Sequence, residues 1–339
     1  MHSIKEVSLF FFLVLTNLSV AQHSSWSSSR PDSHAPISIM GDHYHQKGEF
    51  MFSYRWMSMK MGGMQIGKEN ISSESVLDSY MATPTKMQMN MHMLGLMYAP
   101  SNTVTLMIMS SYLLNDMGLK TKMGMKFSTS SGGFGDTRIS ALVKLLNKSQ
   151  QSLHAMVGIS FPTGNINQKD DTPMMSNAIL GYPMQLGSGT LDPRFGLTYL
   201  GQYEVFSWGT QAQYIFRIGK NSKKYSLGNQ FLGNIWSAFK ATQSISLSAR
   251  LSYLSTTSIK GSDASLNPMM MPLLNSTNSG RNLWGIGLGF NYLILNGALK
   301  NLRLALEVSN PLSQKTKGIQ MKEESAITVG LQYALNHIH

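Results

Sequence analysis

Apolar and polar residues alternate strictly along most of the chain, and this pattern predicts β-strands. Between residues 244 and 253, for example, isoleucine, leucine, alanine and tyrosine alternate with serine and arginine. Side chains two positions apart on a strand share a face, so each such strand has one apolar and one polar face. Strands are predicted at 48–61, 87–99, 103–115, 135–146, 152–161, 191–200, 206–218, 226–240, 244–256, 283–295, 301–309 and 325–335.

The connections between these strands alternate between short and long. Residues 100–102, 147–151 and 241–243 form short connections, whereas residues 62–86 and 162–190 form long ones. Outer-membrane barrels have this arrangement, and closing the sheet also removes its two exposed edges. The sequence therefore predicts an all-β fold, a transmembrane antiparallel up-and-down β-barrel of about 12 strands with short periplasmic turns and long external loops.

The N-terminal residues have the pattern of a secretory signal peptide. Lys5 precedes an apolar run from Val7 to Leu15, and the small residues Ser19 and Ala21 follow at the spacing of a cleavage site. The run is shorter than the ~20 residues of a transmembrane helix. We expect a signal peptide at 1–21, a periplasmic N-terminal segment at 22–46, an outer-membrane β-barrel at 47–335 and a C-terminal tail at 336–339.

Composition and charge agree with an exported membrane protein. The 339 residues include no cysteine, which excludes disulfides and thiolate metal sites, and only 13% are charged whereas 42% are hydrophobic. The net charge of +11 comes from scattered basic residues. For an exported chain the expected partners are outer-membrane lipid, lipopolysaccharide and a small-molecule or metal solute, not nucleic acid. We expect the outer membrane of a Gram-negative bacterium as location and leave the oligomeric state open.

Most of the 26 methionines lie between Met40 and Met125, in stripes of every second residue. An arginine facing lipid at the bilayer midplane costs ~2–4 kcal/mol, so Arg55 should face the lumen with the methionines of its parity. The stripes are then either a path for a soft ion such as Cu(I) or flexible filling of the lumen. The candidate metal-binding methionines are Met87, Met89, Met91, Met93, Met107 and Met109.

The same parity predicts which other side chains face the lumen. Basic residues outnumber acidic ones among them, and a net basic wall favours anions. The predicted lumen residues are Met51, Arg55, Met57, Met59, Arg138, Lys144, Arg217, Arg250, Arg303 and Glu307.

A second candidate metal site lies just before the first strand. His43 and His45 flank Tyr44 and follow Asp42, with His34 upstream. Two imidazoles beside a carboxylate suit Cu(II), Ni(II) or Zn(II). The alternative is a polar segment that leads into the first strand on the periplasmic side. No cofactor is expected beyond bound Cu(I) or Cu(II).

Two glycine-rich motifs resemble a known family. Residues 131–136 read Ser-Gly-Gly-Phe-Gly-Asp and residues 158–164 read Gly-Ile-Ser-Phe-Pro-Thr-Gly. They are similar to signatures of the outer-membrane proteins named for the meta-pathway of phenol degradation, and residues 41–49, 91–100 and 182–190 resemble a methionine-rich branch of that family. The resemblance implies a barrel with a transport or channel role and transfers no catalytic residue.

The leading hypothesis is an outer-membrane channel for passive passage of small solutes through a Met-lined, net-basic lumen. The alternatives are a copper- or silver-handling barrel that uses the Met stripes and the His-x-His segment, and a surface interaction protein. A lipid hydrolase would need a Ser–His pair on the lipid-facing surface. The predicted register turns His154, Ser152 and Ser160 towards the lumen, so we expect no enzyme.

Overall fold

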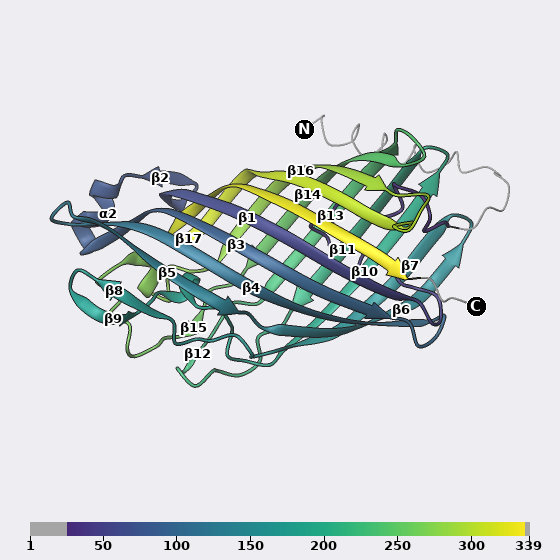
Figure 1. Cartoon of the computed structure of the whole chain (residues 1–339). Helices are drawn as coiled ribbons and strands as arrows, with labels where there is room; N and C mark the ends of the chain where they lie inside the picture. The colour runs from purple at the N-terminus through teal and green to yellow at the C-terminus, as the bar shows by residue number, and fades with distance from the viewer. Residues whose placement is uncertain (1–25, 336–339) are drawn as a thin grey trace, which may run out of the picture.

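The computed structural model describes residues 26–335, so the predicted signal peptide and C-terminal tail lie outside the described residues. Its main element is a closed antiparallel β-barrel (Figure 1). Within residues 26–335, eleven labelled strands form the wall. They are β1 (Phe50–Gly67), β3 (Ala82–Tyr98), β4 (Val104–Thr121), β6 (Thr137–Lys148), β7 (Gln151–Phe161), β10 (Asp192–Tyr203), β11 (Phe206–Ile215), β13 (Gln230–Lys240), β14 (Ile245–Thr256), β16 (Arg281–Leu293) and β17 (Leu302–Leu335).

The long strand β17 crosses the wall twice and closes the barrel. Its first part pairs with β16 as far as Thr316, and its second part pairs with β1, where Leu335 lies opposite Phe50. Between the two parts, Gly318 has a φ of +76°, a left-handed conformation that glycine adopts without a steric penalty. With β17 counted twice, the described wall has twelve crossings, and each overlaps one predicted strand. The predicted fold class is confirmed.

The strands continue beyond the predicted ends on the side of the long loops. β1 runs on to Gly67 and β4 to Thr121, and their extensions pair with β2 (Glu69–Ile71) and β5 (Lys126–Phe134). The sequence pattern missed these extensions because Lys60 of β1 and Asp116 of β4 stand where the apolar outer faces would continue. The smaller elements at this end were also not predicted. They are α2 (Ser73–Ser79), β8 (Lys169–Thr172), β9 (Met175–Ile179), β12 (Tyr225–Ser226), β15 (Lys260–Gly261) and the 3-10 helices η1 (Tyr182–Met184) and η2 (Pro272–Leu274).

A belt of apolar side chains surrounds the outside of the barrel. On β3, Leu94 and Leu96 are about half exposed, whereas Met93 and Met97 on the opposite face are buried. On β14, Leu247 is exposed and Ser246 is buried. This is the arrangement of a transmembrane barrel, whose apolar outer face contacts lipid. Across residues 26–335, no helix is long enough and apolar enough to cross a bilayer.

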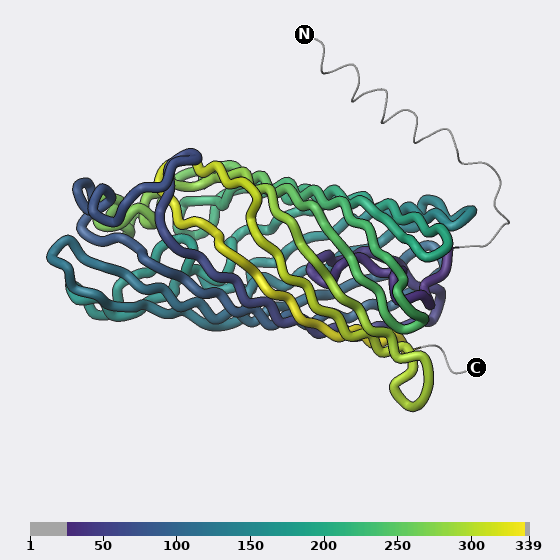
Figure 2. Tube along the Cα trace, turned by 90° about the horizontal axis from the view of Figure 1, so that it is seen from above, coloured from purple at the N-terminus to yellow at the C-terminus, as the bar shows by residue number. Residues whose placement is uncertain are grey.

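The N-terminal segment folds inside the barrel. Its described residues, 26–46, lie in the lumen, at the end of the barrel that carries the short turns. Figure 2 shows this segment in purple between the strands. Ala35 and Ile37 are each 1% exposed and Asp42 is 2% exposed. We call residues 26–46 the plug. The expected entry segment therefore belongs to the interior of the barrel, because the polar groups of the lumen satisfy those of its backbone.

Candidate functional site

The plug is fixed by hydrogen bonds from buried side chains of the barrel wall. Arg55 Nε of β1 donates to the Ile37 carbonyl at 2.9 Å, and Arg303 Nη2 of β17 donates to the Ala35 carbonyl at 2.7 Å. A loop without regular structure has free carbonyls, and burial requires that each finds a donor. Further plug carbonyls accept hydrogen bonds from Ser207, Gln211 and Ser246.

A buried ion pair also holds the plug. Glu307 is 1% exposed and accepts a hydrogen bond from Arg250 Nε at 2.7 Å. Its other carboxylate oxygen accepts from both the backbone N–H and the hydroxyl of Ser38 in the plug. Four of the predicted lumen residues therefore support the plug. Arg55, Arg303 and Glu307 bind it directly, and Arg250 binds Glu307.

Four of the six candidate metal-binding methionines, Met87, Met89, Met91 and Met107, lie directly opposite another methionine on a neighbouring strand, whereas Met93 and Met109 do not. Met93 is buried opposite Arg55, while Met57 and Met59 are half-buried. The opposed pairs are Met51–Met97, Met57–Met91, Met59–Met89 and Met61–Met87 between β1 and β3, and Met97–Met107 and Met87–Met117 between β3 and β4.

Several of these methionines belong to one of two apolar clusters, whereas Met57, Met59, Met91 and Met93 belong to neither. Around the plug, Met51, Met107 and Met109 pack with Met40 and Tyr44, and Met97, Leu142 and Met156 complete that cluster. Under the long loops, Met87 and its half-buried neighbour Met89 belong to a cluster that includes η1 and η2 through Met184 and Leu273. In both places flexible thioether side chains fill irregular space between the wall and an inserted segment.

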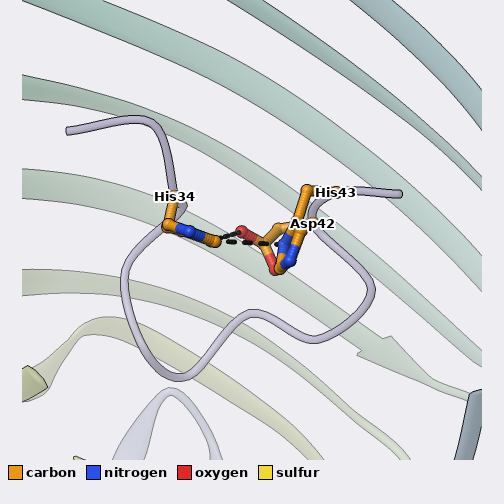
Figure 3. A group of neighbouring side chains, drawn as sticks. All are labelled: His34, Asp42 and His43. Atoms are coloured by element: carbon orange, nitrogen blue, oxygen red, sulfur yellow. Dashed lines mark hydrogen bonds and ion pairs between the residues drawn. The ribbon is translucent and has the colours of Figure 1, made fainter. Parts of the chain in front are cut away.

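Three potential metal ligands meet within the plug. His34 and His43 approach each other and the carboxylate of Asp42, which lies between them (Figure 3). The two Nδ1 atoms are 3.2 Å apart. His43 Nδ1 is 3.0 Å from Asp42 Oδ1, and His34 Nδ1 is 3.4 Å from Asp42 Oδ2. Of the two predicted histidines, only His43 takes part.

His45 is close to this group but is directed elsewhere. Its ring centroid is 4.9 Å from that of His43, and its Nδ1 is 3.2 Å from Glu49 Oε2. Within residues 26–335, His43 Nε2 and His45 Nε2 are buried without a hydrogen-bond partner. Both rings line a cavity of about 450 Å³ at the short-turn end, together with Lys144, whose ammonium group lies 5.8 Å from the Tyr44 ring centre.

The burial of the plug controls the charge of this group. Burial, aided by His43 and Arg303, lowers the pKa of His34 to about 3. Burial alone would raise the pKa of Asp42, but His43 and His34 lower it well below its usual value. Burial also lowers the pKa of His45. The group therefore combines the ionised carboxylate of Asp42 with the neutral imidazole of His34, and neutral imidazole is the form in which histidine binds metals.

A group of arginines lines a separate cavity of about 180 Å³ further along the lumen. Arg138 of β6, Arg194 of β10 and Arg217, just beyond β11, face it. Arg217 forms an ion pair with Asp192, whereas neither Arg138 nor Arg194 forms one with any described residue. Arg194 was not among the predicted lumen residues. The alternation of the strand at 191–200 could have identified it, because Arg194 has the parity opposite to the exposed Phe195 and Leu197.

The two family motifs meet beside this cavity. Asp136 Oδ1 accepts a hydrogen bond from the Gly164 N–H at 3.0 Å, and Asp136 Oδ2 accepts from the N–H and the hydroxyl of Ser188 at 2.8 Å. A Cβ on Gly164 would lie 2.6 Å from the Leu186 carbonyl oxygen, so only glycine fits there. The motifs thus join the start and the end of the long loop 162–190 to the wall.

The serine and histidine residues of β7 do not form a lipid-facing pair. His154 and Ser152 are fully buried in the lumen, and His154 Nε2 donates to the Gly41 carbonyl of the plug at 2.9 Å. His154 is therefore a further contact between the wall and the plug.

A closed barrel with a lipid-facing apolar belt and a polar lumen defines an outer-membrane β-barrel of Gram-negative bacteria. The chain belongs to the family described as "Putative MetA-pathway of phenol degradation", whose model matches residues 75–322. This confirms the family resemblance of the glycine-rich motifs.

Solved structures of outer-membrane barrels share the fold. An outer membrane channel from Pseudomonas putida F1 superposes with a TM-score of 0.60 at 15% identity, over 88% of this chain and 99% of the other. The transport unit of the autotransporter AIDA-I from Escherichia coli gives a TM-score of 0.51 at 11% identity, over 88% and 93% of the two chains. No curated protein matches the sequence.

Proposed function

We propose that the protein is a channel through which small solutes cross the outer membrane without an energy source. The observation that carries this proposal is the series of cavities inside a closed barrel. They measure about 450 Å³ at the short-turn end, about 180 Å³ beside the arginines and about 440 Å³ under the long loops. The similar structure from Pseudomonas putida F1, which is named an outer membrane channel, supports the same role.

Small anions are the preferred solutes in this proposal. Arg55, Arg250 and Arg303 are engaged by the plug or by Glu307, whereas Arg138 and Arg194 face their cavity and form no ion pair among the described residues. Asp136 lines the same cavity, but its carboxylate accepts hydrogen bonds from Gly164 and Ser188. Guanidinium groups bind carboxylate and phosphate oxygens through paired N–H donors. An anion would therefore be more favourable than a cation at this point of the path.

Planar-bilayer recordings in a salt gradient test the proposal. The wild-type protein is expected to show single-channel current with a reversal potential on the anion-selective side. Arg138→Gln and Arg194→Gln, alone and combined, should shift this potential towards zero. Lys126→Gln removes one charge from an exposed position on β5, away from the arginines, and should leave the potential unchanged. A silent protein would contradict the channel, and unaltered selectivity in the double variant would contradict the role of the arginines.

A second candidate function is passage of Cu(I) along the methionines. The register supports it, because Met57 faces Met91 and Met59 faces Met89 across neighbouring strands, and Met89 and Met91 line the cavity under the loops. Thioethers are ligands for Cu(I). Titration of the purified barrel with Cu(I) tests this function. Binding that is no tighter than micromolar, or that is unchanged after replacement of Met89 and Met91 by leucine, would reject it.

A further inference from the structure

We propose that the plug contains a binding site for a divalent transition-metal ion, with His34 Nδ1, His43 Nδ1 and the Asp42 carboxylate as ligands. This inference goes beyond the channel function and does not depend on the passage of any solute. It differs from the Met pathway in ligand chemistry and in place, since all three ligands belong to the plug (Figure 3).

The distances between the ligand atoms match those of a tetrahedral site. Two ligands that are each 2.0–2.1 Å from a tetrahedral zinc ion are separated by roughly 3.3 Å. The two Nδ1 atoms are 3.2 Å apart, His43 Nδ1 is 3.0 Å from Asp42 Oδ1, and His34 Nδ1 is 3.4 Å from Asp42 Oδ2. The two imidazoles thus meet different oxygens of one carboxylate, and a rotation of the Asp42 side chain would bring one oxygen into a face of such a tetrahedron with the two nitrogens.

Hydrogen bonding alone explains the arrangement less well than a shared ion does. If each imidazole donates from its own Nδ1–H to a different oxygen of Asp42, the two N–H groups still face each other at 3.2 Å, which is unfavourable for two donors. An ion at their centre would accept a lone pair from each ligand and remove this repulsion. The carboxylate is already oriented for this role, because Asp42 Oδ2 accepts a hydrogen bond from the Ala35 N–H at 3.0 Å.

The surroundings of the site restrict which ion it would hold. Arg55 and Arg303 are buried nearby and donate to plug carbonyls, so their positive charges oppose any cation held by charge alone. Calcium and magnesium prefer six or more oxygen ligands, which the group does not offer. Nitrogen ligands from two imidazoles favour Zn²⁺, Cu²⁺ or Ni²⁺, which bind imidazole strongly.

An ion can reach the site and leave room for a fourth ligand. His34 and His43 line the cavity of about 450 Å³ at the short-turn end, which can supply water. The two histidines flank residues 35–42, and Arg55 and Arg303 donate hydrogen bonds to two carbonyls of this loop. A bound ion would connect both ends of this loop and stabilise the plug against movement out of the lumen.

Calorimetric titration of the metal-stripped full mature chain in detergent tests the site, with Zn²⁺ as the probe and Mg²⁺ as the control cation. We expect one Zn²⁺ per chain and no heat from Mg²⁺. His34→Ala and His43→Ala should weaken Zn²⁺ binding about tenfold or more, as loss of supporting groups in known metal sites does. His92→Ala is the matched control, because His92 lies on the outer face of β3, beside Tyr54, and should bind as the wild type does.

A spectroscopic measurement keeps the test independent of variant folding. Cu²⁺ bound to the wild type should give an electron paramagnetic resonance spectrum with hyperfine coupling to nitrogen, and Zn²⁺ should displace it. The proposal is overturned if the wild type binds no Zn²⁺, if Cu²⁺ shows no nitrogen coupling, or if folded His34→Ala and His43→Ala proteins bind Zn²⁺ as tightly as His92→Ala. None of these outcomes depends on conductance, so failure of the metal site and failure of the channel can be distinguished.

Discussion

At the scale of single residues, the lumen is held together by buried charges that each have a specific partner. Glu307 neutralises Arg250 and binds Ser38 of the plug, and it is almost completely buried. Removal of one partner from a buried pair leaves the other charge without compensation, which costs more than the pair itself contributes. Both the stability of the barrel and the position of the plug should therefore depend on the Glu307 side chain.

Glu307→Ala is predicted to lower the free energy of unfolding by about 3–5 kcal/mol, because it leaves Arg250 buried without its carboxylate. Guanidinium unfolding in detergent micelles, followed by tryptophan fluorescence, measures the change. Glu69→Ala, at an exposed position on β2, is the control and should unfold with the wild type. An unfolding curve for Glu307→Ala that coincides with this control would show that the pair does not stabilise the barrel.

The methionines around the plug should tolerate a change of chemistry better than a loss of volume. Met109→Leu is predicted to cost less than about 1.5 kcal/mol, since the volume is nearly conserved. Met109→Ala should cost about 2–5 kcal/mol, because it leaves a cavity between the wall and the plug. Guanidinium unfolding compares the two variants. Equal losses would mean that the sulfur atom itself matters, which the filling of space does not explain.

At the scale of elements, the alternation of apolar and polar residues predicted each strand over the part whose outer face contacts lipid. It did not predict the strand extensions beyond the membrane. The range 48–61 stops short of Gly67 because the outward positions turn polar at Ser58 and Lys60, although backbone pairing with β17 continues. The twelve crossings were predictable because each strand carries its own apolar face. The position of Arg55 also predicted which face of β1 lines the lumen. Its partner, the Ile37 carbonyl, lies in a segment without a periodic pattern, so this contact was not predictable.

The long loop 162–190 is an element whose position depends on one carboxylate. Asp136→Ala removes the acceptor of hydrogen bonds from Gly164 and Ser188 and should release the loop. We expect trypsin to cleave after Lys169 faster in this variant, as measured by mass spectrometry of timed digests. Glu69→Ala alters an exposed carboxylate on β2, outside this loop, and should be cleaved at the wild-type rate.

At the scale of the whole molecule, the barrel is predictable from local pattern and its contents are not. Each wall strand repeats the same two-residue period, whereas the plug depends on contacts such as Arg303 to Ala35, between residues at opposite ends of the chain. Its polar composition suggested a periplasmic segment that leads into the first strand, because sequence alone does not reveal the donors that converge on its carbonyls. For the same reason, the sequence did not indicate which histidines of the candidate metal site meet. The folded loop places His34 beside His43, whereas His45 contacts Glu49.

The plug should therefore control how much of the lumen conducts. A chain that keeps residues 1–25 but lacks residues 26–46 is predicted to form a barrel with larger single-channel conductance than the wild type, because the segment occupies the short-turn end. Arg55→Ala with Arg303→Ala should have the same effect in part, with frequent transitions between two current levels, since both donors to plug carbonyls are lost. Lys126→Ala, which removes a cation at an exposed position on β5, serves as the control. Planar-bilayer recording provides the measurement, and equal conductance in the deleted and wild-type proteins would place the solute path outside the space that the plug fills.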